Sequence, residues 1–480
     1  MPSGSPGRPW SAAEWALLAT LFGGGLLVFL TQPINPFPYD DWFLSQDRLW
    51  RREPGGNNYT PVAAPALLYG GIHGLASAAG LGLDVELRLG VLAHQLMLAL
   101  AGVWIYLSHR RLGFGRWSAV AALLAVVFVQ STYVAQAFWS ENVMLWLVSL
   151  SIWLTLEIAT DGGGSRGRFW GLTAALGAAL GLATITRAVP IVLLPAALWM
   201  TKAELPSERW RRFAVGLSAA VAALVAAQMT ANHWRYGRWE LSHSTGLHLW
   251  DGVSYASDAI LAESALYARM KALEPEIQGR WWWELPRPDG IGTTTVDLED
   301  AVRPMVLEGI RRHPALFLRQ GLRDLRRGLF LAPYAIGRSD PGRKNPLGRE
   351  GFVPAPWREG PAVRAALDAI REPLRELYGW ALKAALAGGA VWWAALWLRP
   401  AGERRRRWGE RDFRAWAWLA FVLVTAIYVS NQIEKLDPRF ALPYVGAAAL
   451  LVSLGCRLAT RIPWMALGRD GAITERPRPR

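Results

Sequence analysis

Cysteine and charge are both scarce in this sequence. Cys456 is the single cysteine among 480 residues, so an intrachain disulfide and a cysteine-based metal site are excluded. Because Cys456 lies in an apolar block, we expect it to be a small buried side chain. Charged residues make up only 19% of the chain, and it contains neither a tandem repeat nor an HExxH motif. A disulfide framework, a repeat array and a zinc protease of that type are therefore disfavoured.

Long apolar blocks dominate the composition. Hydrophobic residues make up 52% of the chain, which includes 27 tryptophans, as is typical of several bilayer helices with aromatic belts. The formal net charge is +14, but the arginine clusters stand between apolar blocks, where they set orientation. No aromatic-interleaved basic groove is present, so we expect membrane lipids and no nucleic acid as partners.

The predicted fold class is an all-α polytopic membrane protein with about ten transmembrane helices and an extracytoplasmic domain of mixed or mainly helical structure. The expected spans are residues 14–31, 87–107, 117–134, 140–159, 169–186, 188–203, 213–230, 377–398, 414–430 and 440–459. No small-x-small cleavage pattern follows the first block, so we interpret it as an uncleaved span.

Basic loops predict how the chain is oriented. The clusters at 109–116, 166–168, 202–212 and 404–407 all fall on one side of these ten spans, which the positive-inside rule makes cytoplasmic. Counting residues 61–80 as an eleventh span would break that pattern. We therefore interpret this segment as re-entrant or lying on the membrane surface.

Four regions follow from these spans. They are an N-terminal transmembrane module (1–230) with a first outer loop (32–86), an extracytoplasmic domain (231–376), C-terminal transmembrane helices (377–460) and a basic cytoplasmic tail (461–480). The stretch 231–376 holds most of the polar sequence and is too long for a simple connector.

Two adjacent acids, Asp40 and Asp41, follow the first span. One could cap the helix expected to start at Trp42, and its charge would complement the helix dipole. Capping explains a second acid less well, because an anion beside lipid phosphates is electrostatically disfavoured. A surface-lying amphipathic helix over 42–50 would hold both acids at headgroup level. We interpret the pair as candidate catalytic groups.

Glu141 and Arg187 are expected at the same face of the membrane as the acid pair. Glu141 follows Ser140 in a short turn between two spans, where it could simply support the helix start. Ionisable groups that converge at membrane depth are functional-site candidates by default. Arg187 could extend its side chain toward headgroups or bind a phosphate.

Two further cations lie in the last outer loop. Lys435 and Arg439 stand on the side where short loops avoid positive charge. They could bind an anionic phosphate, or they could form ion pairs with Glu434 or Asp437.

Histidines in the polar region have a weaker signal. His243 and His248 lie in LSHSTGLHLWDG at 241–252, together with Asp251. Their spacing alone is poor evidence for a metal site, and we favour polar loop residues that line a substrate site.

The order of these motifs resembles the GT-C superfamily of integral-membrane glycosyltransferases, particularly the dolichyl-phosphate-mannose protein mannosyltransferase and aminoarabinose transferase branch. The motifs are YDD at 39–41, SEN at 140–142, GLATITRAVPIVLLPAAL at 181–198, LSHSTGLHLWDG at 241–252, RRHPALFLRQGLRDL at 311–325 and DPRF at 437–440. In the first outer loop, NNYTP at 57–61 replaces the Glu-Lys or His-Arg pair that relatives often carry before the prolines.

The resemblance implies transfer of a sugar from a polyprenyl-phosphate donor to a lipid, glycan or protein acceptor at the outer membrane face. Asp40 or Asp41 would be the base, Arg187, Lys435 and Arg439 would face the phosphate, and Glu141 would position sugar hydroxyls or one of these cations. The site would lie on the periplasmic or extracellular side of an inner or plasma membrane. The resemblance implies no particular cofactor, and whether a divalent metal takes part stays open. A polyprenyl-diphosphate glycan polymerase or ligase, a lipid-linked sugar transporter and a noncatalytic scaffold are the alternatives.

Overall fold

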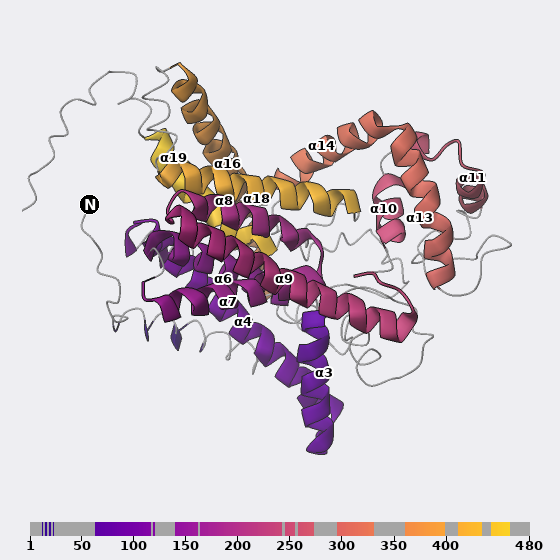
Figure 1. Ribbon diagram of the computed structural model, residues 1–480, viewed down its shortest axis with the longest axis horizontal. Coiled ribbons are helices and arrows are strands. Elements are labelled where there is room, and N and C mark those ends of the chain that lie inside the picture. The colour runs from indigo at the N-terminus through magenta and orange to yellow at the C-terminus, as the bar shows by residue number, and fades with distance from the viewer. Residues whose placement is uncertain are drawn as a thin grey trace, which may run out of the picture.

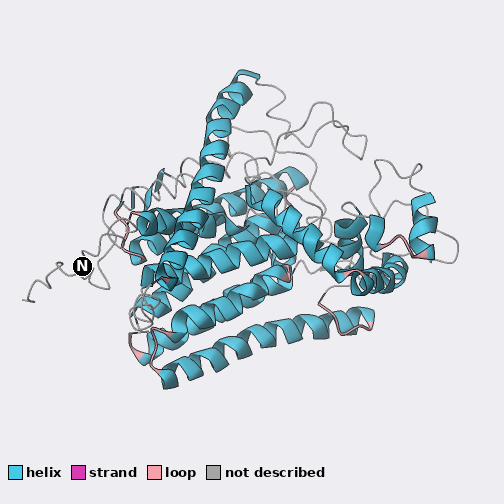
Figure 2. Ribbon diagram, turned by 90° about the horizontal axis from the view of Figure 1, so that it is seen from above, coloured by secondary structure: helices cyan, strands magenta, loops and turns pink. Residues whose placement is uncertain are grey.

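The computed structural model describes residues 63–116, 140–161, 164–241, 245–254, 258–272, 295–330, 361–398, 411–433 and 443–460, with isolated positions at 12–23 and 119–120. Every regular element in these ranges is a helix, and Figure 2 shows the bundle helices side by side. The mainly helical class predicted from the sequence is therefore confirmed for the described part of the chain.

The first group of helices forms most of a bundle (Figure 1). It comprises α3 (Ala63–Ala78), α4 (Leu83–Arg111), α6 (Ser140–Asp161), α7 (Arg166–Thr186), the short 3-10 helix η1 (Val189–Val192), α8 (Leu193–Lys202) and α9 (Ser207–Tyr236).

The later helices include a small polar group and three that return to the bundle (Figure 1). They are α10 (Thr245–Ser254), η2 (Asp258–Ile260), α11 (Ala265–Ala272), α13 (Thr295–Arg312), α14 (Pro314–Phe330), α16 (Pro361–Trp397), α18 (Arg411–Ile433) and α19 (Val445–Ala459).

Five helices of the described chain are long and apolar enough to cross a membrane, which makes this an integral membrane protein. They cover Val85–Arg111, Ser140–Thr160, Arg166–Thr186, Ser207–Trp234 and Arg411–Val429, and shorter apolar helices cover Val189–Lys202 and Val445–Ala459. The remaining predicted spans stay unconfirmed. Residues 14–31 and 117–134 lie almost wholly outside the described chain, and the span 377–398 overlaps α16 up to Trp397, a helix that is not among the five.

Small residues allow the bundle helices to approach closely. A Cβ added to Gly177 of α7 would lie 2.6 Å from the Cβ of Ala220 on α9, and one on Gly455 of α19 would lie 2.5 Å from the Cα of Ala385 on α16. In a membrane the hydrophobic effect does not drive helices together, so close van der Waals packing of this kind stabilises their association instead.

Helix α9 lies at the edge of the bundle. Only 17% of its apolar window is buried, and Val215 is 70% exposed, so much of this helix suits contact with lipid. Trp210 and the exposed Trp234 stand near its two ends, and the intervening helix is about 36 Å long at 1.5 Å per residue. This length matches a bilayer with interfacial aromatic belts.

The bundle has one end rich in arginine pairs. At this end Glu157 of α6 accepts from Arg111 at the close of α4 (2.5 Å) and from Arg168 at the start of α7 (2.6 Å). Arg414 also pairs with Glu204, and Arg457 pairs with Asp412. We call this the basic end. These contacts show that α4 and α6 run in the same direction and α7 in the opposite one, as the sequence pattern predicted.

A second core lies beyond the other end of the bundle. We call residues 245–312, from α10 to α13, the polar unit. Its own buried cluster is Leu247, Ile260, Leu261, Tyr267, Met270, Leu298, Val302, Met305 and Val306. The polar unit falls inside the predicted domain 231–376, whose boundaries stay a prediction.

The expectation for Cys456 was wrong. Its side chain is exposed, although it lies on the apolar helix α19. An apolar helix in a membrane protein has no need to bury all its faces in protein, because lipid can cover the rest.

Candidate functional site

The ion pair between Glu141 and Arg187 is the centre of the candidate site. Arg187 donates from Nη2 to Glu141 Oε1 at 2.8 Å and from Nε to Ser140 Oγ at 3.1 Å. The Glu141 side chain is 1% exposed and that of Arg187 is 26% exposed. The sequence predicted that these residues share one face of the bundle, and the structure brings them into direct contact.

Helix termini position both partners. Glu141 stands in the first turn of α6, where a carboxylate is stabilised by the positive end of the helix dipole. Arg187 follows the last residue of α7 in an extended conformation, with φ −146° and ψ 138°. Its side chain therefore projects from the end of one helix to the start of another.

Two other segments lie near the Glu141–Arg187 pair: the start of α3 and the residue before α19. The backbone N–H of Ala64, at the start of α3, donates to Thr186 Oγ1 at 3.3 Å, next to Arg187. Tyr444 precedes α19, is 2% exposed and lies within electrostatic range of Arg187. The structure thus places Arg187 between α6 and α7, with the start of α3 bound to the residue that precedes it.

Helices α3 and α4 contribute two polar pairs that sequence reasoning did not select. The Tyr69 hydroxyl lies 2.7 Å from His94 Nε2, and His73 Nδ1 lies 2.9 Å from Glu86 Oε1. Tyr69 and His94 are fully buried, and Glu86 is 4% exposed. The signal that could have found His94 is its place inside an apolar helix, where ionisable residues are rare.

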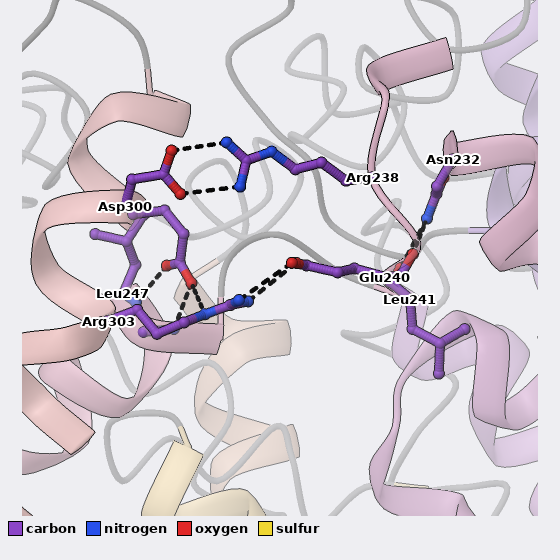
Figure 3. Close-up of polar contacts among 9 residues, drawn as sticks. Asn232, Arg238, Glu240, Leu241, Leu247, Asp300 and Arg303 are labelled. Carbon is purple, nitrogen blue, oxygen red and sulfur yellow. Dashed lines mark hydrogen bonds and ion pairs between the residues drawn. The ribbon is translucent and has the colours of Figure 1, made fainter. Parts of the chain in front are cut away.

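The chain between α9 and α10 is fastened to the polar unit by charged pairs (Figure 3). Arg238 forms two hydrogen bonds with Asp300, at 3.0 and 2.7 Å, and Arg303 forms two with Glu240, at 3.2 and 3.1 Å. Asn232, near the end of α9, donates to the carbonyls of Glu240 and Leu241. The sequence did not predict the pairs Arg238–Asp300 and Arg303–Glu240, whose partners are 62 and 63 residues apart.

Glu299 of α13 fixes the start of α10. Its side chain is fully buried, and its two oxygens accept the N–H groups of Gly246 and Leu247, each at 2.8 Å. Arg303 donates to the same carboxylate at 2.9 Å. Burial lowers the pKa of Arg303, but its hydrogen bonds and charge interactions with Glu240 and Glu299 outweigh burial and raise the pKa above its ordinary value. A Cβ on Gly246 would lie 2.5 Å from the Arg303 Cα, so α10 and α13 touch through glycine.

The other predicted site residues are only partly placed. Asp40, Asp41, His243, Lys435 and Arg439 lie outside the described residues. His248 belongs to α10, the helix that Glu299 caps. Within the described residues no group of three or more histidine, cysteine or acidic side chains could hold a metal ion.

Comparisons with known proteins found little. No protein-family model matches the chain, and no curated protein is similar to it in sequence. Among solved structures, one match is the archaeal oligosaccharyltransferase AglB from Archaeoglobus fulgidus in complex with an inhibitory peptide and a dolichol-phosphate. The TM-score is 0.45 and the identity 13%, over 95% of this chain and 52% of that one. The chain thus spans about half the length of that protein, and the match assigns it neither a family nor an activity.

Proposed function

We propose that this protein is a membrane glycosyltransferase that moves a sugar from a polyprenyl-phosphate donor to an acceptor hydroxyl or phosphate at the outer membrane face. The observation that carries the proposal is the Glu141–Arg187 pair at the end of the bundle opposite the basic end. A buried acid there holds a guanidinium close to where the phosphate of a membrane lipid would lie.

The reaction is a single displacement with inversion at the anomeric carbon. With a hydroxyl acceptor, Asp41 or Asp40 accepts the proton while the acceptor oxygen forms its bond to the anomeric carbon. The bond between that carbon and the phosphate oxygen breaks, and the phosphate leaves with the electron pair. Arg187 stabilises the charge that develops on the leaving phosphate.

The remaining residues have supporting roles in this proposal. Lys435 and Arg439 add positive charge for the phosphate, while His243 and His248 contact the sugar or the acceptor. Glu141 orients Arg187, and its hydrogen bond fixes the guanidinium plane as an arginine–phosphate contact requires. The site faces the periplasmic or extracellular side of an inner or plasma membrane.

Transfer assays on purified protein in lipid test the proposal. Wild type, Asp40→Asn, Asp41→Asn and Arg187→Lys are incubated with radiolabelled polyprenyl-phosphate sugars and a panel of acceptors. One Asp→Asn change is expected to reduce transfer by about 10²-fold or more with folding intact, the lower range for loss of a general base. Glu208→Gln is the matched control, because it also converts an acid to its amide but lies exposed at the basic end.

Two outcomes would favour other functions. Transfer from diphosphate-linked glycans but not from monophosphates would indicate a glycan polymerase or ligase. Donor movement across the bilayer without bond cleavage would indicate a lipid-linked sugar transporter. Normal transfer in both aspartate variants would overturn the assigned base.

A further inference from the structure

Helix α14 exposes a mixed leucine and arginine face. Leu318 is 54% exposed and Leu322 is 61% exposed, one turn apart on the same side of the helix. Arg319 and Arg323 are exposed beside them. On the inner side, Gln320 is 6% exposed and Gly321 is buried. The outward face is therefore apolar in the middle and basic at its edge.

The two halves of α14 pack against different cores. Phe317 packs against the core of the polar unit, and Leu325 packs against the core of the bundle. Figure 1 shows α14 extending from beside α18 toward α13, and α14 contacts both helices. Since α18 is long and apolar enough to cross a membrane, α14 lies at the level where an apolar bundle gives way to a polar unit.

Helix α14 carries a net positive charge. Its sequence holds four arginines against a single aspartate, Asp324. Leucines that enter the acyl boundary and arginines that stay at the phosphates are typical of helices bound at an anionic lipid surface. A helix face in contact with water would not favour two leucine side chains that are each more than half exposed.

We propose that the outward face of α14 binds the anionic phospholipid headgroups of the membrane that the bundle crosses. Leu318 and Leu322 enter the acyl boundary, and Arg319 and Arg323 contact lipid phosphates. The polar unit is thereby held against the membrane surface at a fixed height. This inference is independent of the proposed transferase activity.

Spin-label depth measurements on the full-length protein in phosphatidylglycerol-containing vesicles test the proposal. A nitroxide is placed at Leu322→Cys in a Cys456→Ser background, which removes the single native cysteine. The matched control is Ala268→Cys, an exposed position on α11. Figure 1 shows α11 at the end of the polar unit that is farthest from the bundle. Oxygen and a water-soluble nickel complex report depth.

The label at Leu322 is expected at the headgroup and acyl boundary, about 5–10 Å deep, while the label at Ala268 reads as aqueous. An aqueous reading at both positions would overturn the proposal. So would strong spin–spin coupling at Leu322, because a second copy would then cover this face.

The same label tests the choice of lipid. Replacing phosphatidylglycerol by phosphatidylcholine is expected to shift Leu322 toward water. Arg319→Gln should raise the phosphatidylglycerol content needed for insertion about fivefold, a typical effect for one cation near an anionic surface. Lys271→Gln, an equal charge change at an exposed position of α11, should leave the requirement unchanged. Equal requirements for wild type and the Arg319→Gln, Arg323→Gln double variant would contradict the assignment to anionic lipid.

Discussion

Glu141 and Glu157 are buried carboxylates at opposite ends of α6, and different arginine arrangements surround them. Glu157, which is 3% exposed, accepts from both Arg111 and Arg168 at the basic end. Glu141, which is 1% exposed, pairs with Arg187 among the described residues. The helix dipole accounts for part of this difference. It stabilises an anion in the first turn of α6 and opposes one near the last turn, where extra positive charge compensates.

Glu157 therefore has two arginine partners, whereas the ion pair of Glu141 described above is with Arg187. Loss of one arginine at the basic end leaves Glu157 with another partner. Loss of Arg187 removes the guanidinium that donates to Glu141 at 2.8 Å, and removal of one partner from a buried ion pair is strongly destabilising. A single arginine substitution should therefore lower the free energy of unfolding more at the Glu141–Arg187 pair than at the basic end.

The largest effect is expected from Arg187→Gln. The free energy of unfolding should fall by about 3–5 kcal/mol, because a buried ion pair then keeps only one of its two charges. Denaturant unfolding in detergent measures this change. The double variant Glu141→Gln, Arg187→Gln should recover part of the loss, and a wild-type stability for the single variant would refute the comparison.

A smaller and non-additive effect is expected at the basic end. Arg168→Gln should cost about 1 kcal/mol, whereas Arg111→Gln together with Arg168→Gln should cost about 3 kcal/mol, since only the pair leaves Glu157 unpaired. The same unfolding assay on the two single variants and the double variant measures the coupling. Additive costs would show that the arginines do not share one partner.

The buried Tyr69–His94 contact should contribute less than either carboxylate site. A double-mutant cycle with Tyr69→Phe and His94→Phe is expected to give a coupling of about 0.6 kcal/mol and at most about 1.7 kcal/mol, the average and the upper limit for such hydrogen bonds in a membrane protein. No coupling would show that the two rings are held by packing alone.

The smallest effect is expected at the exposed pair of Glu208 and Arg212. Their side chains are 78% and 60% exposed, and they lie four residues apart on α9. Glu208→Gln should change the free energy of unfolding by about 0.5 kcal/mol or less, because water screens exposed ion pairs. A loss comparable to that of Arg187→Gln would remove the distinction between buried and exposed pairs.

The sequence was informative where long apolar runs specify helices. Predicted span 140–159 became α6 at Ser140–Asp161, and 169–186 became α7 at Arg166–Thr186. The predicted span 188–203 instead contains η1 and then α8. Pro190 lies in the first turn of η1, where its missing N–H and fixed φ are tolerated. Element type followed from composition, but the detailed form could not be read from it, and this span contains two prolines, Pro190 and Pro195.

Part of the site also followed from the sequence. Alternating spans required Glu141 and Arg187 to share one end, and their contact confirms that placement. The pairing of Arg303 with Glu240 could not be predicted, because local pattern does not specify which charges meet across 63 residues. Its pair with Glu299 is four residues away on the same helix and follows a local pattern. The assignments of Asp40, Asp41, His243, Lys435 and Arg439 stay predictions.

Helix α14 links the two cores of the described chain. Phe317 and Leu325 are two turns apart on one rigid helix, yet they pack against separate cores. Melting of α14 would withdraw an apolar side chain from each core at once, so loosening of the polar unit is coupled to loosening of the bundle. Excision of the polar unit without α14 would therefore leave the position that Phe317 fills in its core empty.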